Sequence, residues 1–244
     1  MAPFLNRQRR QSFSSGGGTG SYLGYALGEI ILVTIGILIA LYIKDWHSDQ
    51  QQQKAIYRAA RVVMQDLQSD TTAISMLQSQ YSPQKKYFKE LMLGSMTRDS
   101  LRQCEVCPYL ITSISPFKPT DNGYLLLQKF EVGLQTPRDS LIHQTKLFYK
   151  RNNEMLEVIN GFLREDVSQT LSHWKQNHVW YSRWVNGEIS DAMLQYMLED
   201  PIYKNRVATH YLLVYENYLA ALKAYKQGAT KLASRWQKVL PPHD

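Results

Sequence analysis

Glu29 occupies the most unusual setting of any ionisable side chain in the sequence. It lies inside the apolar run from Tyr22 to Ile43, YLGYALGEIILVTIGILIALYI, which holds no other side chain charged at neutral pH. A carboxyl group inside a membrane span is costly and usually faces a partner. On a helical wheel it shares one broad face with the small residues Gly24, Gly28, Gly36 and Ala40. We interpret this face as a docking surface for another transmembrane helix. In the alternative interpretation, Glu29 lies about 10 Å inside the cytoplasmic end and snorkels or stays protonated.

Cys104 and Cys107 form a C-x-x-C motif that is followed by Pro108. A thioredoxin-like redox site needs a βαβ context, which the surrounding pattern lacks, and covalent haem attachment needs a histidine directly after the motif. A structural zinc ion would need further ligands. We therefore expect a local disulfide that fixes an irregular loop in an oxidising compartment.

The remaining candidates for chemistry are histidines and an aromatic, basic run. The six histidines are scattered, and His173 and His178 are five residues apart, which places them on different faces of a helix. No phosphate-binding glycine loop, nucleophile motif or paired catalytic carboxylates is visible, so we expect no catalytic residue, metal or cofactor. The run WKQNHVWYSRW could contact a partner or lipid headgroups, could stack on nucleic acid, or could close a helix end against the core. Its tryptophans are Trp174, Trp180 and Trp184.

The apolar run is long enough to cross a membrane. Its residues 22–43 would cover about 33 Å as a helix. Tyr22, Tyr42 and Trp46 lie near its ends, where interfacial aromatic anchors are expected. A cleaved signal peptide would be shorter and would end in a small-residue cleavage site, and a core helix would have a polar face.

The charge pattern predicts the orientation. Residues 1–21 hold three arginines and no acid, which places this tail in the cytoplasm and residues 44–244 in the periplasm of a bacterial inner membrane. The chain has a formal charge of +7 and an isoelectric point near 9.3. In an external domain this charge favours an acidic protein or lipid surface, and it does not favour nucleic acid.

A heptad pattern continues from the span into the domain. Apolar positions step by fours and threes, which predicts one long helix that ends before Pro83; the positions are Ile56, Ala60, Val63, Leu67, Asp70, Ile74, Leu77 and Tyr81. Asp70 is the polar member of this heptad face, which we call the seam, and Asp66 precedes it by one turn. Each needs a hydrogen-bonding partner if it is buried, or else lies at an edge that reaches solvent.

The rest of the sequence is also helical in pattern. We expect helices near 84–96, 139–178 and 191–199, and a last long helix opened by Pro201. The inner face of the second of these is expected at Leu141, Phe148, Met155, Ile159, Phe162, Val167, Leu171 and Trp174. Residues 98–136 contain three prolines and are expected to be irregular, with Asp121 capping a short helix. The predicted fold is all-α: one transmembrane helix that continues into an antiparallel helical bundle.

The string YALGEIILVTIGILIALYIKDW resembles the N-terminal signature of a bacterial family of single-pass inner-membrane proteins of unassigned function. The matching positions include Tyr25, Gly28, Glu29, Gly36, Ala40 and Trp46. Looser similarity continues in DLQSD, in Phe117, Pro119, Tyr124 and Leu127, and in DPIYKNRV, whereas the C-x-x-C motif is not a feature of the family. The resemblance implies topology and helical character and implies no activity.

These observations favour a non-catalytic accessory subunit of a larger membrane complex, such as a respiratory, photosynthetic or secretion assembly. It would dock through the glycine face of its span and clamp partners with its external domain. The alternative is an external sensor that binds a small ligand. A tail of 21 residues is too short to fold as an output domain, so a sensor would signal through a partner membrane protein.

Overall fold

The computed structural model describes residues 19–131, 133 and 136–241. All regular structure in this part of the chain is helical, as predicted. The chain divides into two compact units, Met1–Ala55 and Ile56–Asp244. Each unit is described by itself below.

Helix α1, Thr19–Tyr81, begins in the first unit and ends in the second. Pro83 follows directly in the short 3-10 turn η1, Ser82–Gln84, so the predicted end of the helix is confirmed. Seven of the eight predicted seam positions between Ile56 and Tyr81 are buried, and Leu77 packs partly buried against them. The heptad pattern therefore identified the inward face of this part of α1 correctly.

Ten further elements complete the second unit. In chain order they are α2 (Lys85–Leu93), α3 (Arg98–Gln103), η2 (Cys107–Tyr109), α4 (Asn122–Gln128), α5 (Pro137–Asn177), α6 (Tyr181–Val185), α7 (Asp191–Glu199), α8 (Pro201–Tyr211), η3 (Leu212–Tyr218) and α9 (Leu219–Val239). Side chains cap the starts of α5, α7 and α8, where oxygens of Thr136, Ser190 and Asp200 accept backbone N–H groups.

Two local expectations need correction. The region expected to be irregular contains α3, whose start is capped by Thr97. Asp121 does stand before α4, but its side chain makes no capping bond.

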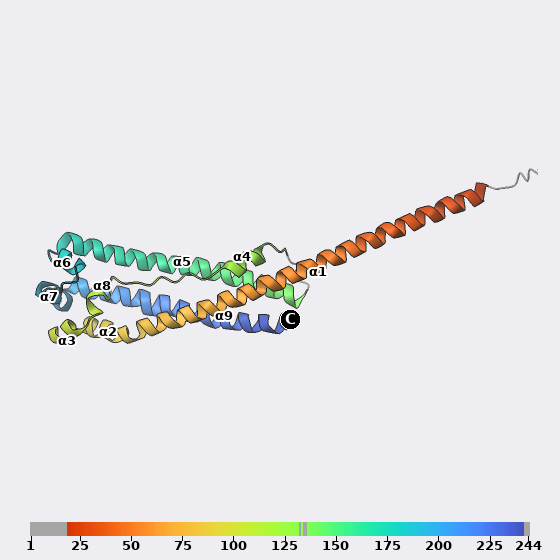
Figure 1. Cartoon of the computed structure of the whole chain (residues 1–244). Coiled ribbons are helices and arrows are strands. Elements are labelled where there is room, and N and C mark those ends of the chain that lie inside the picture. Colours follow the sequence, from red (N-terminus) through yellow and green to blue (C-terminus); the bar gives the residue numbers. More distant parts are fainter. Residues whose placement is uncertain (1–18, 132, 134–135, 242–244) are drawn as a thin grey trace, which may run out of the picture. The chain divides into compact units, whose positions relative to one another are not determined.

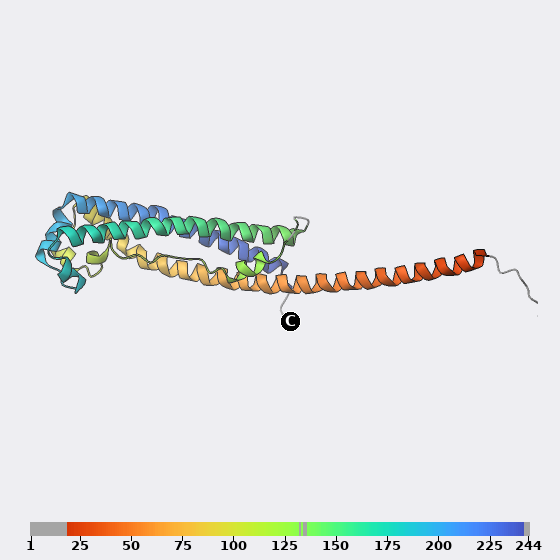
Figure 2. The same ribbon diagram turned by 90° about the horizontal axis from the view of Figure 1, so that it is seen from above.

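The long helices of the second unit lie side by side (Figures 1 and 2). Hydrogen bonds join Tyr81 to Tyr215 and Asp70 to Tyr225, so α1 is antiparallel to the continuous run of α8, η3 and α9. Bonds from Thr145 to Trp236 and from Asp166 to His210 give α5 the same relation to that run. Consequently α1 and α5 run in the same direction, and the predicted antiparallel bundle is met only in part.

An extended segment, residues 113–121, returns along the helices and makes this parallel pair possible. Its backbone is bonded by side chains from three helices. The Tyr81 hydroxyl accepts from Ser115 N at 3.0 Å and the Tyr218 hydroxyl donates to Ser115 O at 2.7 Å. Asn160 Nδ2 donates to Phe117 O at 2.8 Å. The buried backbone groups of a segment without helical bonds need such partners, and here the side chains provide them.

The π-helical segment η3 lies in the middle of the last helical run. Tyr215 and Tyr218, both in η3, donate hydroxyl bonds to Tyr81 O and Ser115 O. Compared with a continuous α-helix, a π-helical segment changes the direction in which the side chains after it point around the helix axis. It therefore lets these two tyrosines and the inward face of α9 point to the same core.

Candidate functional site

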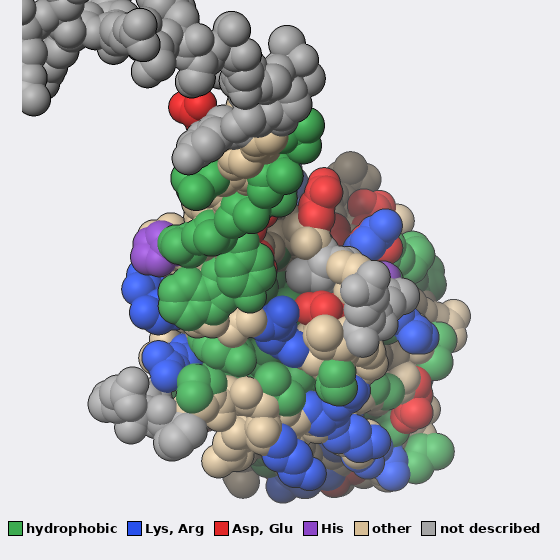
Figure 3. Space-filling model, turned by 90° about the vertical axis from the view of Figure 1, so that its right-hand side faces the viewer, with side chains coloured by type: hydrophobic (Ala, Val, Ile, Leu, Met, Phe, Trp, Pro, Cys, Tyr) green, Lys and Arg blue, Asp and Glu red, His purple; other side chains and the backbone are tan. Residues whose placement is uncertain are grey.

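The described parts of the chain do not bury the most apolar stretch of α1. Its most apolar 18-residue window has a mean hydropathy of 2.4, and none of that window is buried. In length and composition this helix can cross a membrane; a signal sequence passes the same test, and a soluble core helix would pass it but would be mostly buried. Apolar side chains cover the described N-terminal part of α1 in Figure 3.

The three glycines of the predicted docking face are not required by packing within the chain. A Cβ atom built on Gly24, Gly28 or Gly36 would meet no atom within 4 Å. Glu29 and Ala40 are exposed in the same helix, and no hydrogen bond or ion pair to Glu29 occurs within the described residues. The face is thus smooth, open and carries one carboxyl group.

Of the predicted interfacial anchors, Tyr42 and Trp46 are exposed on α1. The side chain of Tyr22 lies outside the described residues, although its backbone belongs to α1.

Asp66 and Asp70 are buried and bonded, which decides between the two interpretations of the seam carboxylates. Asp70 accepts from Thr120 N at 3.1 Å and from the Tyr225 hydroxyl at 2.5 Å. Asp66 accepts from Gly123 N at 2.7 Å. Burial raises the pKa of both carboxyl groups, and the bonds they accept oppose this effect. The pair fixes the extended segment and α4 against α1, which is a structural role.

Cys104 and Cys107 are joined by a disulfide in the structure. The bond links the end of α3 to η2, and both side chains are buried. The loop is also held from α6, because Trp184 Nε1 donates to Pro108 O at 3.1 Å. The disulfide therefore cross-links a short local loop. No group of three or more metal-ligating side chains occurs within the described residues.

Trp174, Trp180 and Trp184 are all buried, and Trp180 and Trp184 each pack edge-on against Trp174. They close the end of α5 against α6 and α7, which is the last of the three interpretations of the aromatic run. They therefore do not form an exposed surface for a partner or for headgroups.

The histidines contain a pair that spacing did not predict. His173 and His178 meet with ring centroids 5.5 Å apart, because α5 ends at Asn177 and the chain turns back. A second pair, His210 Nδ1 and Asp166 Oδ2 at 2.6 Å, joins α8 to α5 and had no signal in the sequence. Neither pair belongs to a group of three metal-ligating residues in the described part of the chain.

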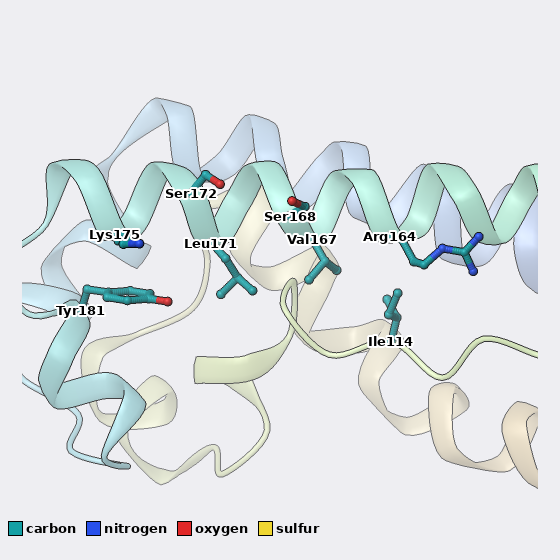
Figure 4. Close-up of a pocket in the computed structure, with 8 residues that line it drawn as sticks. All are labelled: Ile114, Arg164, Val167, Ser168, Leu171, Ser172, Lys175 and Tyr181. Atoms are coloured by element: carbon teal, nitrogen blue, oxygen red, sulfur yellow. The ribbon is translucent and has the colours of Figure 1, made fainter.

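The grooves on the second unit include two that have apolar and basic residues in their lining. One has a volume of about 350 Å³ and runs along α5 (Figure 4). Figure 4 shows Val167 and Leu171 on α5 above Ile114, with Tyr181 toward one end and Arg164 toward the other. The other groove, of about 690 Å³, lies between α1 and α9. It has an apolar floor that includes Leu67 and Ala229, and Arg61 is at one end.

A comparison with known proteins finds no matching family model, no similar curated protein and no similar solved structure.

Proposed function

We propose that this protein is a non-catalytic accessory subunit of a larger membrane complex. In this proposal residues 22–43 span a bacterial inner membrane, the N-terminal tail is cytoplasmic and the helical domain is periplasmic. The span docks against the transmembrane helix of another membrane protein, and the domain, arranged as a helical bundle, contacts the external face of that complex. The family resemblance of the N-terminal segment leads to the same expectation of a single-pass protein.

The observation that carries the proposal is the open glycine face with Glu29. Glycine in a helix interior costs about 1 kcal/mol relative to alanine, so three glycines without contacts in the chain need a reason outside it. Small residues allow a second transmembrane helix to approach closely. A carboxyl group in hydrocarbon needs a hydrogen-bonding partner, and the chain offers Glu29 none within the described residues. A partner helix that carries a donor satisfies both needs.

The test is co-purification from native membranes in mild detergent, with identification of the chains that migrate together. We expect a stoichiometric membrane partner with the wild type, and its loss with Gly28→Leu or Glu29→Leu. Glu29→Gln keeps a hydrogen-bonding group and should retain the partner in part. Thr34→Leu is the matched control, because Thr34 lies on the opposite side of the helical wheel. Equal recovery of the partner with Gly28→Leu and Thr34→Leu would contradict the proposal, and so would capture of a second copy alone.

The groove on α5 favours a second candidate function, an external domain that binds a small ligand and signals through a partner helix. Arg164 and Lys175 border this groove, and Ser168 and Ser172 line it, so it suits a small anion with an apolar part. A small anionic ligand that raises the melting temperature of the isolated full-length protein would favour this function. Stable co-purification of a partner without such a ligand favours the accessory subunit.

A further inference from the structure

The groove between α1 and α9 has a floor and a rim of different character. Its floor is apolar and small, with Met64, Leu67, Ala229 and Ala233. Amides and hydroxyls line its sides, among them Gln65, Gln68, Thr230, Ser234 and Gln237. A shape of this kind accepts a molecule with an apolar part and a polar head.

The charged side chains that the described residues of α9 bring to the groove region are all basic. Helix α9 carries Lys223, Lys226, Lys231, Arg235 and Lys238 and no acidic residue. Among the described residues no ion pair involves a side chain of α9. On a helical wheel Lys231 and Lys238 lie next to the side of α9 that lines the groove. Figure 3 shows Lys and Arg side chains gathered over the lower part of the face at which α9 ends.

The α1 side of the groove has the same sign of charge. Arg61 lines the groove, and Arg58 is exposed about one turn before it. The two acids of α1 in this unit, Asp66 and Asp70, point into the core and are 6% and 2% exposed. The acids therefore contribute little screening at the surface, and an anionic head at the Arg61 end would meet several cations.

The chain also keeps this groove near lipid. Only residues 44–55 separate the apolar run from the start of the second unit at Ile56. Even fully extended they reach about 40 Å. An anionic lipid from the same membrane is consequently the anion with an apolar part that is present at the highest local concentration.

We propose that the α1–α9 groove binds one anionic phospholipid. The phosphate of its headgroup lies at the end marked by Arg58, Arg61 and Lys238. The upper part of an acyl chain contacts the partly exposed apolar residues of the groove, Met64, Ala233 and Leu240. This inference rests on the proposed membrane anchoring for the source of the lipid, and not on the proposed partner.

The experiment uses the full-length protein in an uncharged detergent and counts bound lipid by native mass spectrometry. The probes are phosphatidylglycerol and phosphatidylcholine with the same acyl chains. We expect phosphatidylglycerol to bind at least fivefold more tightly, since phosphatidylcholine carries the same phosphate but adds a choline cation that the basic side chains repel, and one such charge interaction gives about that factor. Lipids held along the span contribute equally to all variants, so the comparison between variants isolates the groove.

Two pairs of variants separate charge from shape. Arg61→Gln should weaken phosphatidylglycerol binding about fivefold, whereas Arg151→Gln, at an exposed arginine of α5, should leave it unchanged. Ser234→Trp fills the groove without changing its charge and should abolish the specific lipid, whereas Ser182→Trp, at an exposed serine of α6 that lines neither groove, should not. Circular dichroism confirms that each variant is folded.

Three results would overturn the proposal. They are equal binding of the two lipids, equal binding by the Ser234→Trp and Ser182→Trp variants, and complete displacement of the lipid by inorganic phosphate or by a poly-glutamate peptide. Co-purification of the transmembrane partner is measured separately with the Glu29 variants. Lipid selectivity without a partner, or a partner without lipid selectivity, therefore shows which of the two proposals has failed.

Discussion

At the scale of single residues, the most consequential pair is Asp70 and Tyr225. Their hydrogen bond joins helices 155 positions apart in sequence, and the same carboxylate holds Thr120 N in the extended segment. Desolvation of Asp70 is offset by these bonds only while all partners are in place. Removal of the carboxylate leaves a buried N–H group and a buried hydroxyl without acceptors.

We predict that Asp70→Ala lowers the free energy of unfolding by about 3 kcal/mol, because two buried donors lose their acceptor. Asp70→Asn keeps one acceptor and should cost about 1 kcal/mol at neutral pH. The measurement is thermal unfolding of the full chain in detergent, followed by circular dichroism. The prediction is wrong if the alanine variant melts within one degree of the wild type.

The raised pKa of Asp70 also predicts a pH dependence. Because the folded pKa is above the unfolded value, the folded state binds more protons in this range, and this group's contribution to stability falls as pH rises from about 4 through the folded pKa. Asp70→Asn removes this contribution. The deficit of the asparagine variant should therefore be larger at pH 4 than at pH 7, as the two melting curves at each pH will show. A constant difference would contradict the prediction.

Gly123 is the glycine that packing requires most strongly. A Cβ atom there would lie 2.3 Å from Val63 N, a backbone atom of α1 that has no free rotation to relieve the contact. We predict that Gly123→Ala costs about 3 kcal/mol, because α4 must move away from α1 and the bond to Asp66 is lost. Gly161→Ala is the control, since nothing lies within 4 Å of that position in α5. It should stabilise the protein by about 1 kcal/mol. Chemical unfolding of both variants tests the contrast.

At the scale of elements, the sequence predicted local periodicity well and long-range order poorly. The seam from Ile56 to Tyr81 repeats every seven residues, and this repeat can be read without knowing which helices pack against it. Helix 191–199 was predicted with its observed bounds. The path of residues 113–121 depends on bonds from Asp70, Asn160 and Tyr218, which no local pattern reveals. The parallel order of α1 and α5 follows from that path and was missed for the same reason.

The inward face of α5 shows how polar core residues mislead an apolar pattern. Phe162 was expected inside but is 59% exposed, whereas Leu163 is buried. The buried stripe includes Thr145, Asn160 and Thr170, each with a hydrogen-bonding partner. A search for apolar residues alone skips these positions and moves the expected face by one residue. In the candidate site, by contrast, the glycines and Glu29 were proposed from their types and spacing, and the structure adds that no atom of the chain would meet a Cβ atom at those glycines.

The π-helical segment η3 leads to a prediction about register. Insertion of one alanine next to the exposed Glu216 would rotate everything after it by about 100° relative to α8. Tyr225, Leu232 and Trp236 could not then all keep their buried places. We expect a loss of several kcal/mol and exposure of apolar surface, measured by dye binding and thermal unfolding. Deletion of one residue there would instead let the π turn close to an α turn and would leave the facing of α9 nearly unchanged. Replacement of Glu216 by Ala, which keeps the length, is the control and should be nearly neutral.

At the scale of the whole molecule, the proposed membrane anchoring and the disulfide together predict on which side of the membrane the tail and the helical domain lie. Disulfides persist in oxidising compartments and are rare in a bacterial cytoplasm. If residues 44–244 are periplasmic, Cys104 and Cys107 should be oxidised in native membranes. A cysteine placed in the tail, at Ser14 for example, should be a free thiol on the other side.

We predict that whole cells treated with a membrane-impermeant thiol reagent show no labelling of either site, and that opened cells show labelling of the Ser14→Cys variant only. Mass spectrometry with and without reductant should then reveal a mass difference of two hydrogens for Cys104 and Cys107 alone. The disulfide closes a short loop, so Cys107→Ser should cost only about 2 kcal/mol and should leave the protein folded for the same labelling test. A free dithiol in protein taken from its native membrane, or labelling of the tail in intact cells, would reverse the orientation. The lipid proposed for the α1–α9 groove would then come from the cytoplasmic leaflet, where anionic lipid is also present.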